Sequence, residues 1–336
     1  MRQVHTYPHR VFLRPARAYA LPASAPTVVL TGVIAMLLCY FLAFTQACAA
    51  QPPEAAGAPS MIWHSEDMRV YAIQDRPGAM RSSLFSGPAS DAERAACFPD
   101  GSTPGGVSVF LLDTGSERIL FDTGYGDAGS PAKGRLFDLM DSGVLPPESI
   151  DYIYLTHMHG DHIGGLLRDG KRVFPASKIV VSKPELDYWT ALAQKDPANG
   201  SAAKVQEVVA AYEGDVLPPF AFGATLHVNI TALDAAGHTP GHTAFRINGV
   251  GASLLVIGDL LHAASLQFGY PEECASYDVD RQAAVASRKN ILGMAAQEGI
   301  PIAGMHIPFP ASGDVQVKDA GFVFTPFAGE KAELRK

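Results

Sequence analysis

Apolar and polar positions divide most of the chain into short strands and helices that alternate. Strand patterns begin at residue 68, and two apolar runs at 107–113 and 118–122 flank the turn Thr114-Gly115-Ser116, which predicts a hairpin. Further strands are predicted at 149–156, 178–182, 225–233 and 301–306, with a second hairpin at 243–258 and helices at 133–142, 184–193, 202–212 and 280–297. The elements form two similar halves. This order predicts a layered α/β architecture in one domain.

The first fifty residues follow a different pattern. A basic region without acidic residues precedes an apolar run at 28–44 and a stretch of small residues; its arginines are Arg2, Arg10, Arg14 and Arg17. This order is typical of a secretory signal with cleavage near Ala49 or Ala50, which predicts a periplasmic or secreted protein. An uncleaved membrane anchor and a lipoprotein lipidated at Cys48 are the alternatives. Residues 51–66, which begin with a stretch rich in Pro, Ala and Gly, are predicted to be a linker to a domain at 67–336.

The charge balance argues against nucleic-acid binding. The chain has 26 Lys and Arg against 34 Asp and Glu, a net charge of −8, and loss of the leader's four arginines leaves 22 against 34, or −12. Phosphate contacts need clustered basic residues, which are missing here. Removal of the leader also leaves two cysteines, Cys97 and Cys274, and the sequence does not decide whether they pair.

The stretch "YLTHMHGDHIGG" concentrates potential metal ligands directly after an apolar strand. His157 and His159 are two residues apart at the strand end, so their side chains leave the same face. Gly160 lets the backbone turn, so that Asp161 and His162 can reach a metal from a different direction than His157 and His159. Four ligands arranged in this way suit two metals better than one, and zinc held by imidazoles keeps a position open for water.

Three later segments offer further ligands at the ends of apolar strands. "AGHTPGHTAF" contains His238 and His242, "VIGDLLH" contains Asp259, and "AGMHIPFP" contains His306. Each residue alone would more often have a structural role. Together with the first cluster they complete two coordination spheres.

In this order the motifs resemble those of the metallo-β-lactamase superfamily, over nearly the whole chain after residue 68. The resemblance implies a four-layer αβ/βα sandwich with the site along one edge of two sheets. It implies two divalent metal ions bridged by Asp259, with zinc first and iron, manganese or cobalt as alternatives. The implied ligands are His157, His159 and His242 for one metal and Asp161, His162 and His306 for the other.

Two neighbouring residues are assigned from the same resemblance. Asp122 in "FDTGYG" matches the buried aspartate that holds the histidine loop in place. His238, the first histidine of "GHTPGH", is expected beside the ligands in a supporting or structural role.

The segments "GHTPGHTAF", "GDLLHAASLQFGYPEE" and "MHIPFP" resemble the methyl parathion hydrolase-like and lactonase branch. The implied activity is hydrolysis of an ester-type bond in a small molecule, a lactone, a carboxyl or aryl ester or an organophosphate triester. The attacking group would be a hydroxide shared by the metals and oriented by the catalytic Asp161. A β-lactamase or thioester hydrolase of the same fold, and an iron-dependent oxidoreductase or sulfur dioxygenase, are the alternatives.

The substrate pocket is less defined than the metal ligands. His262 and Gln267 are predicted to line it, and Tyr188, Trp189 and Phe268 are predicted either to form an aromatic wall or to belong to the core. A homodimer is possible, and contact with a membrane is expected only if the N-terminal segment stays uncleaved.

Overall fold

The computed structural model describes residues 58–127, 134–331 and 334, and the predicted signal segment lies outside this part of the chain. Two seven-stranded sheets dominate it. The first has the strand order β18 (Glu330–Lys331), β1 (Ser60–His64), β2 (Arg69–Arg81), β4 (Ser102–Asp113), β5 (Arg118–Phe121), β6 (Tyr152–Tyr154) and β9 (Lys178–Val180). The second has the order β10 (Thr225–Leu226), β11 (Ile230–Asp234), β12 (Thr243–Gly249), β13 (Ala252–Val256), β15 (Ile302–Ala303), β16 (Ser312–Lys318) and β17 (Gly321–Pro326).

Helices and small ribbons complete the fold. The helices are α2 (Asp91–Cys97), α3 (Arg135–Asp141), α4 (Gly160–Ile163), α5 (Lys183–Lys195), α6 (Gly200–Ala211), α7 (Ala264–Gln267) and α8 (Arg281–Glu298). Two-stranded ribbons pair β3 (Phe85–Ser86) with β14 (Cys274–Ala275) and β7 (Leu167–Arg168) with β8 (Lys171–Arg172). Among the described helices, none is both long and apolar enough to cross a membrane.

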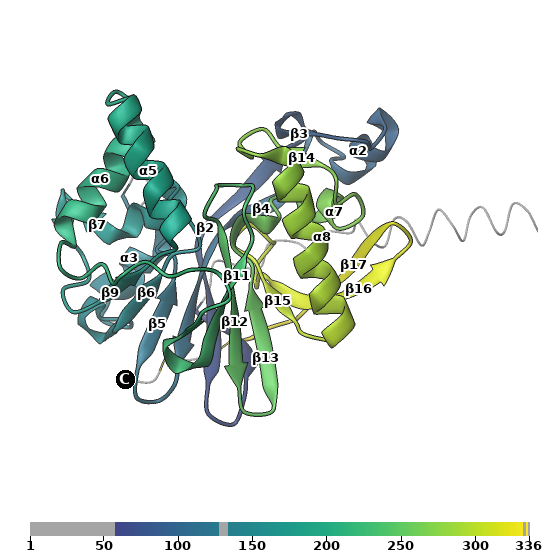
Figure 1. Cartoon of the computed structure of the whole chain (residues 1–336). Coiled ribbons are helices and arrows are strands. Elements are labelled where there is room, and N and C mark those ends of the chain that lie inside the picture. The colour runs from purple at the N-terminus through teal and green to yellow at the C-terminus, as the bar shows by residue number, and fades with distance from the viewer. Residues whose placement is uncertain (1–57, 128–133, 332–333, 335–336) are drawn as a thin grey trace, which may run out of the picture. The chain divides into compact units, whose positions relative to one another are not determined.

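Alternation along β4 explains the layers. Phe110 and Leu112 point into the core between the sheets, and Val109 and Leu111 point into a second core beneath α3, α5 and α6. Both faces of the first sheet are therefore covered, so β4 buries four consecutive apolar residues at 109–112. Figure 1 shows α5 and α6 on one side of the sheets and α8 on the other. The predicted four-layer sandwich is confirmed.

Three of the differences between the structure and the predicted elements concern strands. Strand β1 lies inside the predicted linker and pairs with β2, because "SMIWH" buries Ile62 and Trp63 in the core. The predicted strand 225–233 is broken at residues 227–229, where Val228 and Asn229 adopt positive φ angles. Strand β16 was not predicted at all.

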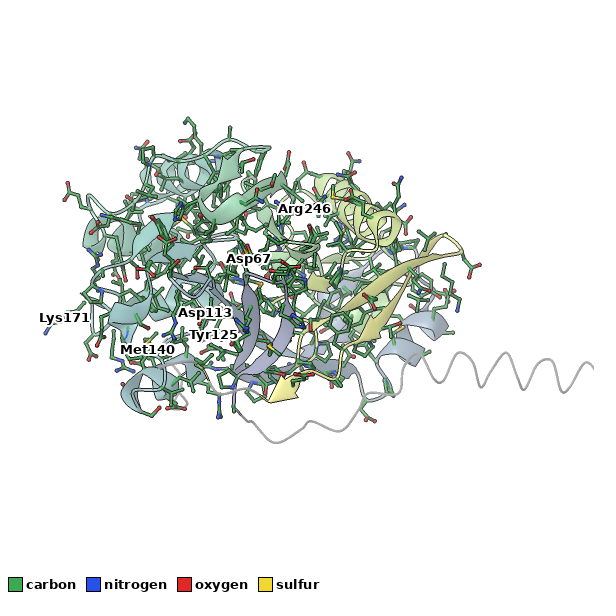
Figure 2. All side chains as sticks on the ribbon, turned by 90° about the horizontal axis from the view of Figure 1, so that it is seen from below. Asp67, Asp113, Tyr125, Met140, Lys171 and Arg246 are labelled. Atoms are coloured by element: carbon green, nitrogen blue, oxygen red, sulfur yellow. The ribbon has the colours of Figure 1, made fainter. Side chains whose placement is uncertain are left out.

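Side chains fill the space between the ribbons in the view of Figure 2. Lys171 is exposed and projects outward at the periphery, where its charge stays in contact with water. The thiols of Cys97 and Cys274 are both buried, and they form no disulfide.

Candidate metal centre

The polar residues singled out from the sequence converge where strands of both sheets end. His157 and His159 follow β6, and His162 lies in the short helix α4 that comes next. From the second sheet, Asp259 follows β13 and His306 follows β15. A ring of loops from two sheets therefore surrounds one buried site.

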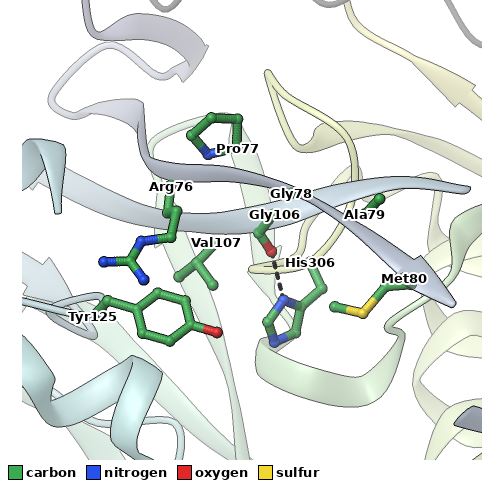
Figure 3. Close-up of a pocket in the computed structure, with 9 residues that line it drawn as sticks. All are labelled: Arg76, Pro77, Gly78, Ala79, Met80, Gly106, Val107, Tyr125 and His306. Atoms are coloured by element: carbon green, nitrogen blue, oxygen red, sulfur yellow. Dashed lines mark hydrogen bonds between the residues drawn. The ribbon is translucent and has the colours of Figure 1, made fainter. Parts of the chain in front are cut away.

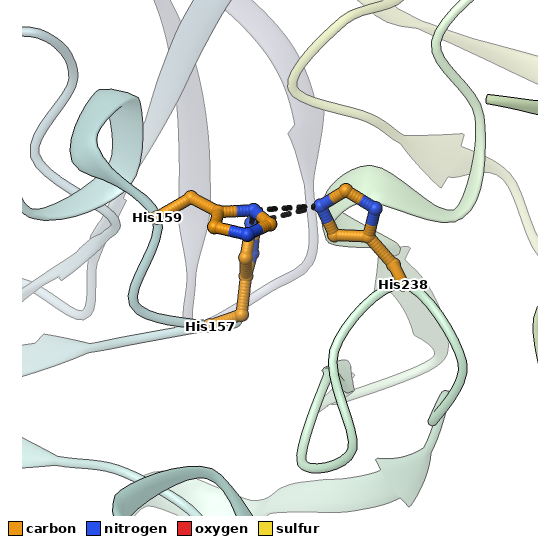
Figure 4. Close-up of side chains that lie close together, drawn as sticks. All are labelled: His157, His159 and His238. Atoms are coloured by element: carbon orange, nitrogen blue, oxygen red, sulfur yellow. Dashed lines mark hydrogen bonds between the residues drawn. The ribbon is translucent and has the colours of Figure 1, made fainter. Parts of the chain in front are cut away.

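Three histidines form the first cluster. The Nδ1 atom of His159 lies 2.9 Å from Nε2 of His157 and 2.9 Å from Nε2 of His238, and the two Nε2 atoms are 3.2 Å apart. Figure 4 shows the rings meeting from two sides. Three nitrogens in a triangle cannot all hydrogen-bond to one another, whereas nitrogens bound tetrahedrally to zinc at about 2.0 Å are separated by about 3.3 Å. The triangle therefore fits a single cation.

The two histidines in "GHTPGH" lie differently from the prediction. Nδ1 of His242 faces the carbonyl oxygen of Ala235 at 2.9 Å, and its Nε2 accepts the backbone N–H of Asp259 at 2.9 Å. Both of its ring nitrogens are thus used by backbone groups. His242 therefore lies outside the cluster for which it was predicted, and His238, which was expected only to support the site, lies in it.

A glycine explains why the His242 ring is held away from the cluster. Gly258 has a φ of +56°, and a Cβ atom there would lie 2.4 Å from Nε2 of His242. The glycine lets the backbone before Asp259 approach the imidazole closely enough for the Asp259 N–H to donate to it.

Asp161, His162 and His306 form the second cluster. Nε2 of His162 is 3.8 Å from Oδ1 of Asp161, and Nε2 of His306 is 3.6 Å from Oδ2 of the same carboxylate. The Asp161 side chain is 21% exposed, whereas the His162 side chain is fully buried. Asp161 is therefore the member of this cluster that solvent can reach.

Asp259 lies between the two clusters, as predicted for a bridging ligand. Its Oδ1 atom is 3.2 Å from Nε2 of His162, and its Oδ2 atom is 3.1 Å from Nε2 of His306 and 3.3 Å from Nε2 of His238. His162 Nε2 and Asp259 Oδ1 are buried without a hydrogen-bond partner among the described residues. Unsatisfied buried groups of this kind are costly, and a cation between them would satisfy both.

Burial sets the charge states of these groups. Desolvation lowers the pKa of His159 to about 4 and that of His238 to about 3, and it holds the pKa of His157 well below its usual range. Burial alone would raise the pKa of Asp259, but the surrounding histidines, above all His162, lower it well below its usual range. Neutral imidazoles beside an ionised carboxylate are the donors that divalent metals prefer, so His157, His159 and His238 with Asp259 fit a metal ion. The carboxylates of Asp259 and Asp161 raise the pKa of His162 and of His306 despite their burial, so these two imidazoles would release a proton when they bind a metal.

A second set of contacts orients the ligands. Asp122 accepts hydrogen bonds from the backbone N–H of Thr156 at 2.8 Å and from its hydroxyl at 2.7 Å, and it lies 2.7 Å from Nδ1 of His162. The structure thus places Asp122 as expected, holding the histidine loop. Asp278, which no motif in the sequence indicated, contacts Nδ1 of His238 at 3.0 Å.

Three of the predicted pocket residues belong to the core. Trp189 is 3% exposed, and its ring meets that of His159 edge-on at 5.6 Å. Tyr188 packs half-buried against the same helical core, and Phe268 is buried and stacks on Phe324. Of the three, Trp189 is the one that contacts a histidine of the first cluster.

His262 and Gln267 also lie close to the centre. Nε2 of His262 is 3.1 Å from Oδ2 of Asp259, and its ring stacks on that of His306 at 5.1 Å. The side-chain oxygen of Gln267 accepts the backbone N–H of His262 at 2.7 Å. Gln267 is completely buried and fixes the His262 loop, and it does not line the pocket beside His306.

A pocket of about 160 Å³ opens beside His306 and contains none of the predicted wall residues. It lies against β2 and β4 and is lined by Arg76, Pro77, Gly78, Ala79, Met80, Gly106, Val107, Tyr125 and His306. The Arg76 guanidinium stacks on the Tyr125 ring at 4.2 Å, and Figure 3 shows the Tyr125 hydroxyl directed toward His306. The backbone N–H of Tyr125 donates to the buried Asp75 at 2.8 Å, which fixes this edge of the pocket.

Comparison with known proteins identifies the family. Residues 102–321 match the metallo-beta-lactamase superfamily, and the chain belongs to it. A beta-lactamase-like protein 2 homolog of Caenorhabditis elegans is 34% identical over 83 residues, which are 24% of this chain and 26% of that protein. The aligned segment thus spans only about a quarter of this relative.

Two solved structures match over much more of the chain. The hydrolase AbOPH of the beta lactamase superfamily has a TM-score of 0.74 and 26% identity, covering 82% of this chain and 99% of that one. AidC, a dizinc quorum-quenching lactonase, has a TM-score of 0.73 and 27% identity with the same coverage. The predicted superfamily is confirmed, and these neighbours indicate a hydrolase.

Proposed function

We propose that this protein is a dinuclear metal-dependent hydrolase of ester-type bonds, with a lactone or carboxyl ester as its natural substrate. The observation that carries the proposal is Asp259, whose two carboxylate oxygens face both donor clusters. His157, His159 and His238 would hold one divalent ion, and Asp161, His162 and His306 the other. When bound, the ions would supply Lewis acidity and an activated water for attack on the substrate.

The chain's own residues then divide the remaining tasks. Asp161, the partly exposed carboxylate, would orient the attacking water and accept its proton. The Tyr125 hydroxyl, which points into the pocket toward His306, would donate a hydrogen bond to a polar oxygen of the substrate. Pro77, Met80 and Val107 give the pocket an apolar side that suits an acyl or alkyl group.

A neutral or weakly polar ester suits the site better than a polyanion, because the chain has a net charge of −8. The resemblance to a lactonase over most of the chain supports the same substrate class. Zinc is the first choice of metal, because imidazole and carboxylate donors without cysteine suit it, although the same donors accept iron or manganese.

The proposal is tested by kcat/KM for five substrates on one zinc-loaded preparation. The panel comprises an acyl lactone, an aryl carboxyl ester, an aryl phosphotriester, an acyl thioester and a cephalosporin. We expect the lactone or the carboxyl ester to be turned over best, and the Tyr125→Phe variant to lose about 10-fold or more in kcat/KM with unchanged zinc content. A cephalosporin or thioester turned over best would replace the proposed substrate, and redox activity with iron alone would replace the reaction class.

Export to the periplasm or beyond belongs to the same proposal. Its support is the arginine-rich and apolar character of residues 1–50. N-terminal sequencing of protein recovered from the periplasm or medium should begin near residue 50. Recovery of only the intact, membrane-associated chain would favour the anchor.

A further inference from the structure

Glu185 is a fully buried carboxylate that lies in neither metal cluster. It occupies the first turn of α5, where the Ser182 side chain caps the helix by accepting the Glu185 backbone N–H. A glutamate at this position usually returns to the backbone of its own N-cap residue. The Glu185 carboxylate is instead directed to two loops distant in the sequence.

Four donors satisfy the Glu185 carboxylate. Oε1 accepts the backbone N–H of Met158 at 2.8 Å and the indole N–H of Trp189 at 2.7 Å. Oε2 accepts the hydroxyl of Thr239 at 2.6 Å and the backbone N–H of Gly241 at 3.1 Å. A carboxylate has about four acceptor positions, so the side chain is used completely.

The donors come from the two loops that supply the first cluster. Met158 lies between His157 and His159 in the loop after β6 of the first sheet. Thr239 directly follows His238 in the loop before β12 of the second sheet. One carboxylate therefore joins the two segments whose separation sets the triangle of ring nitrogens.

The loop that carries His238 is pressed tightly against the start of α5. A Cβ atom at Gly241 would lie 2.0 Å from the backbone nitrogen of Glu185, and the Ser182 hydroxyl donates to the Gly241 carbonyl at 2.7 Å. The second cluster is oriented by other groups, because His162 contacts Asp122 and His306 contacts the carbonyl of Gly106.

We infer that Glu185 is a positioning residue that fixes His157 and His159 against His238, and so controls one of the two metal positions selectively. The inference rests on the proposed dinuclear function. In Glu185→Gln an amide NH2 group, which cannot accept a hydrogen bond, replaces one of the two acceptor oxygens. This group then faces two donors, either those of Met158 and Trp189 or those of Thr239 and Gly241. Thr239→Val keeps the side-chain shape and removes a single donor. Asp187→Asn is the matched control, because Asp187 lies on the same helix with an exposed side chain.

The experiment is a competition titration of the metal-free full-length proteins with zinc and a chromophoric chelator, which resolves two dissociation constants. In Glu185→Gln we expect one constant to rise about 10- to 100-fold, as for other groups that orient metal ligands, and the other to stay within about twofold. Thr239→Val should give a smaller rise of the same constant, and Asp187→Asn should match the wild type. The visible spectrum of the cobalt-substituted variants should change for one of the two ions.

The outcomes separate the two proposals. A wild-type protein that takes up no zinc would overturn the proposed function and the inference together. A wild-type protein with two zinc sites and variants with unchanged constants would overturn the inference alone, as would an equal weakening of both sites. If Glu185→Gln does not fold, Thr239→Val decides in the same way.

Discussion

Separate replacement of His238 and His242 by alanine is the sharpest check on the metal centre, because the two residues share one loop and differ only in where their rings point. His238→Ala removes one of three nitrogens from the first cluster, so the protein should keep about one zinc equivalent. His242→Ala leaves that cluster complete and should keep both. It does, however, leave the Ala235 carbonyl and the Asp259 N–H, both buried, without their hydrogen-bond partner.

The expected cost of His242→Ala follows from those two contacts. A buried polar group left unsatisfied costs about 1–3 kcal/mol, so the metal-free protein should lose roughly 2–6 kcal/mol in its free energy of unfolding. A whole domain is stable by about 5–15 kcal/mol, so the loss will be obvious. His242→Gln, whose amide can both donate and accept, should recover part of it.

The assay combines elemental analysis after gel filtration with urea unfolding of the chelator-treated proteins. The metal assignment is refuted if His242→Ala retains one zinc equivalent while His238→Ala retains two. Equal stability of His242→Ala and the wild type would refute the structural role given to the His242 ring.

Three further results are expected. Asp259→Ala removes the carboxylate whose two oxygens face both clusters, so zinc content should drop below one equivalent by elemental analysis, and near-native loading would contradict the bridge. Gly258→Ala combines a positive φ with a Cβ placed 2.4 Å from His242, so urea unfolding should show a loss of at least about 1–3 kcal/mol, and a neutral result would argue against that close approach. Both thiols are buried, and burial also raises the pKa of the Cys274 thiol, so iodoacetamide at pH 8 should label neither Cys97 nor Cys274 until urea is added, as peptide mapping would show; labelling of the folded protein would mean that the thiols are accessible.

The sequence revealed the members of the site better than their roles. His157, His159 and His162 were predictable because an apolar strand leads directly into them, and residues at strand ends gather at a sheet edge. Which of His238 and His242 joins the first cluster was not predictable from the sequence, because each ring is oriented by contacts with segments distant in the sequence. Glu185 was hidden for a different reason: a glutamate three residues after Ser182 already has a local explanation as part of a helix start.

The fold shows the same division between local pattern and tertiary contact. Helices α5 and α8 were predicted to within a few residues because their ends carry local signals, such as the N-cap residues Ser182 and Asp280. Strand β1 was missed because its five residues follow a stretch rich in Pro and Ala, and only pairing with β2 makes them a strand.

The site takes its donors from both sheets, and this gives a bound metal pair a mechanical role. Asp259 and His238 follow strands of the second sheet and face His162 and His157, which follow a strand of the first. Cys97 and Cys274 form no disulfide that could link segments of the chain. A bound metal pair would instead link the two sheets and stabilise the folded protein, because the ions bind the folded chain and not the unfolded one. Chelation would then act on this protein as reduction acts on a disulfide-bonded one, leaving a chain that proteases cleave more readily.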